Sequence, residues 1–169
     1  MDTIKLTIDN REVEVPKGTT ILKAAQSMGI DIPTLCHFEF KGMDVHNRPG
    51  GCRICVVEVE KRRNLAPACV TECMEGMVVR TNSIRVINAR KTVLELILSD
   101  HPNDCLQCEK SGDCELQALA ARMGIREIPF KGEQSHYEQD TTLSVYRDMD
   151  KCVYCRRCET MCNKFQSVV

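Results

Sequence analysis

Residues 50–59 read Gly50-Gly51-Cys52-Arg53-Ile54-Cys55-Val56-Val57-Glu58-Val59. Two glycines precede a C-x2-C pair, and an apolar run with the character of a strand follows it. Glycine lets backbone N–H groups approach an anionic centre, and paired thiolates are ligands for such a centre. The stretch therefore predicts a metal-binding loop that leads into a buried β-strand.

Regular structure is predicted on both sides of this loop. Residues 4–8 alternate apolar and polar side chains before a turn at 9–11, which indicates a β-hairpin with one buried face. Thr19 or Thr20 can cap a short helix that ends at Gly29. The remaining elements are the second hairpin strand at 12–15, a loop over 31–53, and strands at 55–59 and 77–81. Together they predict a compact α+β unit.

The second half of the chain is expected to be helical and then irregular. Ser83 can cap a helix that runs to about Ser99 and ends before His101-Pro102-Asn103-Asp104. Its apolar positions recur at helical separations: Val86, Ile87, Val93, Leu94, Ile97 and Leu98. Asp113 can cap a second helix that ends at Gly124. Residues 125–147 show no clear period.

Cysteine is the unusual residue in this chain, at twelve of 169 positions. The formal net charge of −1 argues against an electrostatic nucleic-acid binder. Neither a run of eighteen apolar residues nor a signal peptide is visible, so we expect a cytoplasmic protein without membrane attachment. Thiols stay reduced in the cytoplasm, and a chain with little apolar area needs disulfides or bound metal to stabilise its fold. The composition therefore predicts bound metal rather than disulfides.

The first cysteine group has the spacing C-x15-C-x2-C-x13-C and consists of Cys36, Cys52, Cys55 and Cys69. It shares the C-x2-C core and the remote fourth ligand of plant-type [2Fe–2S] sites, although its first gap is longer. Zinc is the alternative, but zinc sites more often join two close pairs. Cys73 is surplus and is expected to be a buried thiol that packs like an apolar residue, rather than a substitute for Cys69.

The second group has the spacing H-x3-C-x2-C-x5-C and consists of His101, Cys105, Cys108 and Cys114. Zinc and iron–sulfur chemistry both use such a donor set. Cys114 would lie at a helix N-terminus, where the helix dipole favours a thiolate.

The third group has the spacing C-x2-C-x2-C-x3-C and consists of Cys152, Cys155, Cys158 and Cys162. This is the run of bacterial ferredoxins, in which three cysteines bind one [4Fe–4S] cluster and the fourth binds a second cluster. We therefore expect Cys152, Cys155 and Cys158 to share one cluster whose fourth ligand lies outside this segment, and Cys162 to bind another. The absence of a second run suggests the front portion of a longer polypeptide.

Other polar residues carry less information. His37, His46 and His136 are expected to be exposed and uninvolved, and Arg156-Arg157 to form a solvated face. Nucleophile-elbow, Walker A and dinucleotide-binding motifs are all missing from the sequence. The segment is therefore expected to carry no substrate-converting site.

Three phrases carry a family resemblance: residues 51–59, Gly112-Asp113-Cys114-Glu115-Leu116-Gln117 and Cys155-Arg156-Arg157-Cys158-Glu159-Thr160-Met161-Cys162-Asn163. In this order they resemble the N-terminal half of the catalytic subunit of multimeric [FeFe]-hydrogenases, which are NAD(P)-linked or electron-bifurcating. The resemblance covers essentially the whole chain. It implies four segments: a β-grasp [2Fe–2S] ferredoxin domain over 1–80, a small helical [4Fe–4S] domain with one histidine and three cysteine ligands over 81–124, a connector over 125–140 and the first half of a two-[4Fe–4S] ferredoxin domain over 141–169.

The resemblance also implies a function. The segment would relay single electrons to or from an H2-activating site, with NAD(P)H or ferredoxin as the redox partner. The catalytic H-cluster is expected only in a C-terminal region that this segment lacks. The implied partners are a flavin-containing NAD(P)H-oxidising subunit, a small [2Fe–2S] subunit and soluble ferredoxin.

Three alternatives remain open at this point. NAD-dependent formate dehydrogenases and the large iron–sulfur subunit of complex I share the same modules. The C-x2-C-x2-C-x3-C run makes formate dehydrogenase the nearer rival, because the complex I subunit typically has C-x2-C-x3-C in its third motif. A non-redox zinc-binding interaction module is a second class of function. A self-standing electron carrier is the third.

Overall fold

The computed structural model describes residues 2–166 apart from 41, 43, 44, 48, 49, 134, 135, 139, 142, 143 and 145. The chain divides into two compact units, which are described separately. The first unit combines the residues up to Arg90 with those from Cys155 onward, and the second unit is Lys91–Tyr154. This division differs from the predicted segments, because the part of the 141–169 segment that starts at Cys155 packs with the N-terminal residues.

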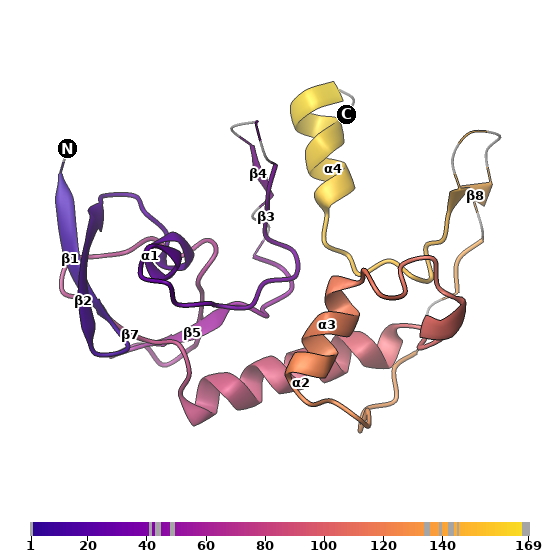
Figure 1. Cartoon of the computed structure of the whole chain (residues 1–169), viewed down its shortest axis with the longest axis horizontal. Helices are drawn as coiled ribbons and strands as arrows, with labels where there is room; N and C mark the ends of the chain where they lie inside the picture. Colours follow the sequence, from indigo (N-terminus) through magenta and orange to yellow (C-terminus); the bar gives the residue numbers. More distant parts are fainter. Residues whose placement is uncertain are drawn as a thin grey trace. The chain divides into compact units, whose positions relative to one another are not determined.

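A five-stranded mixed sheet forms the framework of the first unit (Figure 1). Its strand order is β2-β1-β7-β5-β6. The strands are β1 (Thr3–Ile8), β2 (Arg11–Pro16), β5 (Val56–Val59), β6 (Ala66–Pro67) and β7 (Val78–Arg80). All neighbours are antiparallel except β1 and β7, which run parallel. The predicted hairpin and both predicted strands are confirmed.

The hairpin β1–β2 turns at Asp9 and Asn10, whose φ angles are 46° and 64°. Positive φ at both central residues matches the twist of the flanking strands, and Asx residues tolerate it well. The carboxylate of Asp9 also accepts a hydrogen bond from the backbone N–H of Thr81 at 2.7 Å, and another from the Thr81 hydroxyl. Asp9 thereby ties the turn to the end of β7.

Helix α1 (Ile21–Ser27) packs its apolar side on the sheet (Figure 1). Thr20 caps it and accepts from the backbone N–H of Lys23 at 3.4 Å, while Gly29 follows with φ at +72°. This confirms the helix predicted between the threonines and Gly29. The core joins helix and strand residues: Leu6, Ile8, Ile21, Leu22, Ala25, Val57, Val59 and Val79.

Residues 31–53, predicted to be a loop, contain two short strands. β3 (Phe38–Glu39) and β4 (His46–Asn47) pair antiparallel, with Phe38 opposite Asn47. Two-residue strands have no sequence periodicity, so alternation could not reveal them. The first unit also includes helix α4 (Arg157–Met161) and the π-helical turn η2 (Cys162–Gln166).

Helix α2 (Ile84–Asp100) begins in the first unit and ends in the second. The Ser83 hydroxyl accepts from the backbone N–H of Val86 at 3.3 Å, which confirms Ser83 as its cap. The guanidinium of the buried Arg90 donates twice to the carbonyl oxygen of Val56, at 2.8 and 3.1 Å, and so anchors the helix on β5. Ile87, one of the apolar positions at helical separation, is 52% exposed.

The second unit continues with a 3-10 turn η1 (Cys105–Gln107), helix α3 (Glu115–Arg122) and the short pair β8 (Asp140–Thr141) and β9 (Tyr146–Arg147). The cap of α3 is Cys114, so the prediction of Asp113 was wrong by one residue. The Gln117 side chain accepts from the N–H of Gly112 at 3.1 Å, which orders the loop without an Asp cap. Among the described residues, every helix is too short or too polar to cross a bilayer.

Candidate metal centre

The four cysteines of the first group come from separate parts of the first unit. Cys36 follows α1, Cys52 and Cys55 lie in the loop before β5, and Cys69 follows β6. Cys36, Cys55 and Cys69 are 1% exposed or less, whereas Cys52 is half-buried. The sheet therefore brings a remote cysteine from each side to the central C-x2-C pair.

These thiols are arranged as two pairs. The S–H of Cys36 donates to the sulfur of Cys52, which lowers the pKa of Cys52 to about 6 and raises that of Cys36. The S–H of Cys69 donates to the sulfur of Cys55, which lowers the pKa of Cys55 to about 7 and raises that of Cys69. Cys55 and Cys69 also interact electrostatically with Cys36, so the two pairs are neighbours.

Backbone N–H groups point at the sulfurs. The N–H groups of Ile54 and Cys36 lower the pKa of Cys52, and the N–H groups of Cys69 and Ala68 lower the pKa of Cys55. In each case the effect is smaller than that of the hydrogen bond from the thiol partner. Such donors stabilise negative charge on sulfur. The surroundings therefore favour a thiolate at Cys52 and at Cys55, although Cys55 is buried.

The backbone of the C-x2-C loop adopts a conformation that suits a tight turn around the sulfurs. Gly50 has φ at +62°, and a Cβ atom there would lie 3.2 Å from the side chain of Val70. Arg53 has φ at 59°, a left-handed conformation that non-glycine residues rarely adopt. Strained backbone of this kind clusters at ligand sites.

The first group fits a [2Fe–2S] cluster. Such a cluster needs four thiolates, two on each iron, and the structure supplies two pairs of thiols with N–H donors to their sulfurs. Among the described residues, no three His, Cys, Asp or Glu side chains gather around one position in the manner of a single-ion site.

Cys73 lies outside these pairs. It is 5% exposed and belongs to the apolar core, where burial raises its pKa to about 11. This agrees with the prediction that Cys73 packs as a small apolar residue.

The second group lies wholly in the second unit. Cys105 opens η1 and is exposed, while His101, Cys108 and Cys114 are half-buried. Cys114 lies at the N-terminus of α3, as predicted, and is the N-cap of that helix. The donors thus come from a helix end, a 3-10 turn and a helix start within fourteen consecutive positions.

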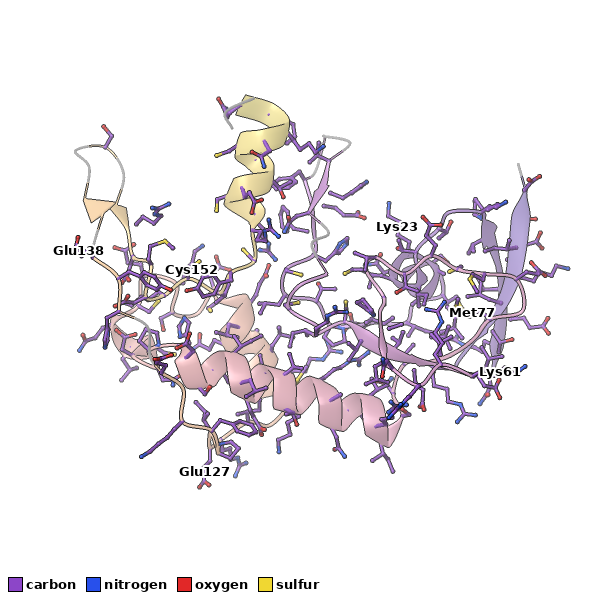
Figure 2. The ribbon with its side chains drawn as sticks, turned by 180° about the vertical axis from the view of Figure 1, so that it is seen from behind. Lys23, Lys61, Met77, Glu127, Glu138 and Cys152 are labelled. Carbon is purple, nitrogen blue, oxygen red and sulfur yellow. The ribbon has the colours of Figure 1, made fainter. Side chains whose placement is uncertain are left out.

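The third group is divided between the units. Cys152, labelled in Figure 2, belongs to the second unit, and the other three cysteines belong to the first. Cys155 is half-buried just before α4, whereas Cys158 within α4 and Cys162 at its end are exposed.

Two predictions about polar side chains were wrong. His37 is 8% exposed rather than solvated, and with the half-buried His46 it faces the carboxylate of Glu39, at 4.0 and 3.7 Å. Lys23 of α1 (Figure 2) reaches the same carboxylate at 3.5 Å. Arg157 is half-buried, with its guanidinium on the carbonyl oxygen of Leu35 at 2.8 Å. The contact of Arg157 joins residues 122 positions apart, so no local pattern could reveal it.

His136 and Arg156 are exposed, as predicted. His136 contacts the carboxylate of Asp150 at 3.3 Å, and Arg156 forms two hydrogen bonds with the carboxylate of Glu159. Sequence analysis also missed Asn47, which is 1% exposed and joins Cys36 to Cys155 by hydrogen bonds.

Two family profiles match the chain in succession. A 2Fe-2S iron-sulfur cluster binding domain matches residues 1–83, and an NADH-ubiquinone oxidoreductase-G iron-sulfur binding region of the 4Fe-4S type matches residues 90–129. The first match contains the first cysteine group, and the second contains His101, Cys105, Cys108 and Cys114.

The chain is similar to subunits of larger redox enzymes. It is 59% identical over 168 residues to the NADP-reducing hydrogenase subunit HndD of Solidesulfovibrio fructosivorans, a match of 99% of this chain and 29% of that protein. It is 38% identical over 171 residues to the G 2 subunit of NADH-quinone oxidoreductase from Rhizobium meliloti (strain 1021), covering 98% of this chain and 19% of that protein. The chain thus spans less than a third of either relative.

A solved structure is also similar: the crystal structure of NAD+-reducing [NiFe]-hydrogenase in the H2-reduced state. It matches with a TM-score of 0.83 and 31% identity over 95% of this chain and 66% of that chain. The two profiles give the cofactors and their order. The chain carries a [2Fe–2S] cluster binding domain followed by a [4Fe–4S] binding domain.

Proposed function

We propose that this chain relays single electrons within an NAD(P)-linked hydrogenase. The observation that carries the proposal is the arrangement of the first group, in which two pairs of thiols, three of them buried, receive hydrogen bonds from backbone N–H groups. Burial and hydrogen bonds to sulfur are the means by which a protein sets the potential of a cluster. The 59% identity to an NADP-reducing hydrogenase subunit supports the choice of enzyme.

The proposed ligands are those that the sequence predicts. Cys36, Cys52, Cys55 and Cys69 would bind the [2Fe–2S] cluster of a β-grasp domain, and His101, Cys105, Cys108 and Cys114 a [4Fe–4S] cluster. Cys152, Cys155 and Cys158 would bind a further [4Fe–4S] cluster with a fourth ligand outside the segment, and Cys162 would bind another. When bound, these clusters accept and release electrons one at a time.

The proposal also covers the partners of the chain, its compartment and the type of hydrogenase. Its partners would be a flavin-containing NAD(P)H-oxidising subunit, a small [2Fe–2S] subunit and soluble ferredoxin, in the cytoplasm. We propose the [FeFe] type for the hydrogenase, because the three cysteine phrases resemble that family. The similar solved structure is of the [NiFe] type, so the metal content of the isolated complex tests this point.

The ligand assignment is tested by EPR spectroscopy of the reduced, anaerobically purified protein. Cys52→Ser and Cys55→Ser should each abolish or strongly change the [2Fe–2S] signal, because a thiolate donor is lost. Cys73→Ser is the matched control and should leave that signal intact, since Cys73 lies outside the two pairs. An unchanged signal in both ligand variants, or a colourless zinc-containing protein, would overturn the assignment.

The second candidate is an equivalent relay in an NADH-quinone oxidoreductase. The profile over residues 90–129 and the 38% identity to a subunit of such an enzyme favour it. Exposure of the isolated oxidised complex to H2 separates the candidates. Bleaching of the iron–sulfur absorption under H2 supports the hydrogenase, whereas bleaching with NADH but not with H2 supports the oxidoreductase.

A further inference from the structure

Asn47, at the end of β4, is a buried polar residue that the proposed ligand sets do not use. Its side-chain Nδ2 donates to the carbonyl oxygen of Cys36 at 2.5 Å and to that of Cys155 at 2.8 Å. Its Oδ1 accepts from the hydroxyl of Thr160 at 2.5 Å. A flipped amide would place Oδ1 against two carbonyl oxygens, so the chemistry of the partners fixes its orientation.

The surrounding contacts hold the same two segments together. The guanidinium of Arg157 donates to the carbonyl oxygen of Leu35 and lies 4.7 Å from the ring centroid of Phe38. The rings of Phe40 and Phe165 meet edge to face at 6.1 Å between centroids. The β3–β4 hairpin therefore forms a docking surface for α4 and η2, and Asn47 is its buried polar contact.

We infer that Asn47 is a positioning residue that fixes Cys155 of the third cysteine group against Cys36 of the first. The inference rests on the proposed function, in which Cys36 and Cys155 bind different clusters. In the relay one cluster loses an electron and the other gains it, with no bond made or broken. The rate of such a transfer falls steeply with the distance between the clusters. A residue that joins a ligand of each cluster helps to fix that distance, and through it the rate.

This role accounts for the long first gap of the first group. The fifteen residues between Cys36 and Cys52 include β3 and β4, and hence the whole docking surface between Phe38 and Asn47. A shorter gap, as in plant-type sites, would hold the cluster but would leave no hairpin to bind α4.

The test variant replaces the two N–H donors of the Asn47 side chain and keeps the shape of that side chain. Asn47→Asp retains an oxygen acceptor for Thr160 but turns an oxygen toward the carbonyl groups of Cys36 and Cys155. Thr160→Val is the matched control that removes only the third hydrogen bond. Asn88→Asp makes the same chemical change at an exposed position of α2.

Two readouts apply to the purified complex, because the proposed fourth ligand of the third cluster lies outside this segment. The first is the magnetic interaction between the two reduced clusters in EPR, together with the iron content and the spectrum of each cluster. The second is amide hydrogen exchange over residues 156–166, which does not depend on iron. We expect Asn47→Asp to keep the [2Fe–2S] spectrum, to lose the magnetic interaction and to exchange about tenfold faster, whereas Asn88→Asp changes neither readout and Thr160→Val keeps the interaction.

An unchanged interaction and unchanged exchange in Asn47→Asp would overturn the inference. A wild-type protein without iron–sulfur signals would instead overturn the proposed function, and the exchange measurement would still report on the docking. If Asn47→Asp retains no iron, Asn47→Ser removes the bridge without adding charge, and the same two readouts decide.

Discussion

The first and second cysteine groups lie in opposite surroundings. Three of the four thiols in the first group are 1% exposed or less, and all four are paired by hydrogen bonds. In the second group Cys105 is exposed, and His101, Cys108 and Cys114 are half-buried on loops and helix ends. The comparison indicates that the apolar core builds the first site, and we expect the second site to depend on bound metal for its order.

The distribution of buried apolar residues supports this difference. One cluster of seventeen buried residues lies in the first unit. In the described part of the second unit, the buried apolar side chains are Leu94, Leu98, Leu116 and Leu119. A unit with so small a core requires an additional stabilising link, and bound metal provides one.

The largest expected difference between the two units is their response to removal of iron. Anaerobic treatment with a chelator should leave β1 and β7 protected from amide exchange, because apolar side chains of the core hold these strands. Exchange in α3 should rise by roughly 100-fold, since four buried leucines cannot hold the second unit alone. Equal loss of protection in both units would contradict the comparison.

Replacement of His101 should shift the potential of the second site. Imidazole is neutral and thiolate is anionic, so His101→Cys adds negative charge and should lower the potential by on the order of 100 mV. Redox-titrated EPR measures the shift, and the potential of the [2Fe–2S] cluster serves as the internal control. A potential that rises or stays fixed would exclude His101 as a ligand.

Loss of the surplus thiol should cost stability without changing a spectrum. Cys73→Ala removes a buried sulfur and should destabilise the first unit by about 1 kcal/mol, measured by denaturant unfolding. Burial raises the pKa of Cys73 from 9.0 to about 11, so between these values the folded state keeps a proton that the unfolded state releases. The contribution of Cys73 to stability should therefore fall as the pH rises from 9 to 11. The alanine variant should lack that part of the pH dependence.

The smallest expected effect is at the cap of α1. Thr20→Ala removes the acceptor for the N–H of Lys23 and should destabilise the first unit by about 0.5 to 1 kcal/mol. Ser83→Ala removes the corresponding acceptor at α2 and is the matched comparison. Thermal unfolding of both variants shows whether loss of the α1 cap or loss of the α2 cap destabilises the first unit more. A larger loss at Ser83 would mean that α2 limits the stability of the first unit.

Local pattern predicted much of the fold. Alternation gave the β1–β2 hairpin, helical spacing with Ser83 gave α2, and Gly29 and Gly124 gave two helix ends. These features depend on neighbours within a few residues, so the sequence contains them directly. The error at Asp113 is a shift of the helix cap by one position.

Tertiary contacts decided the rest. The burial of Arg157 depends on Leu35, 122 positions away, and the hydrogen bond between Asn47 and Thr160 spans 113 positions. Cysteine spacing predicted that the first group forms a set. It could not predict that Cys36 pairs with Cys52 and Cys69 with Cys55, because the loops fix that arrangement.

The parallel pairing of β1 with β7 has a consequence for biosynthesis. β2 follows β1 at once, but Thr7 pairs with Val78, 71 positions later (78 − 7). Translation therefore produces every cysteine of the first group before the strand that closes the sheet, and the sheet is what buries their thiols. On the ribosome, the sheet that buries the first group therefore cannot be complete before Val78–Arg80 has been synthesised, although all four cysteines are already present.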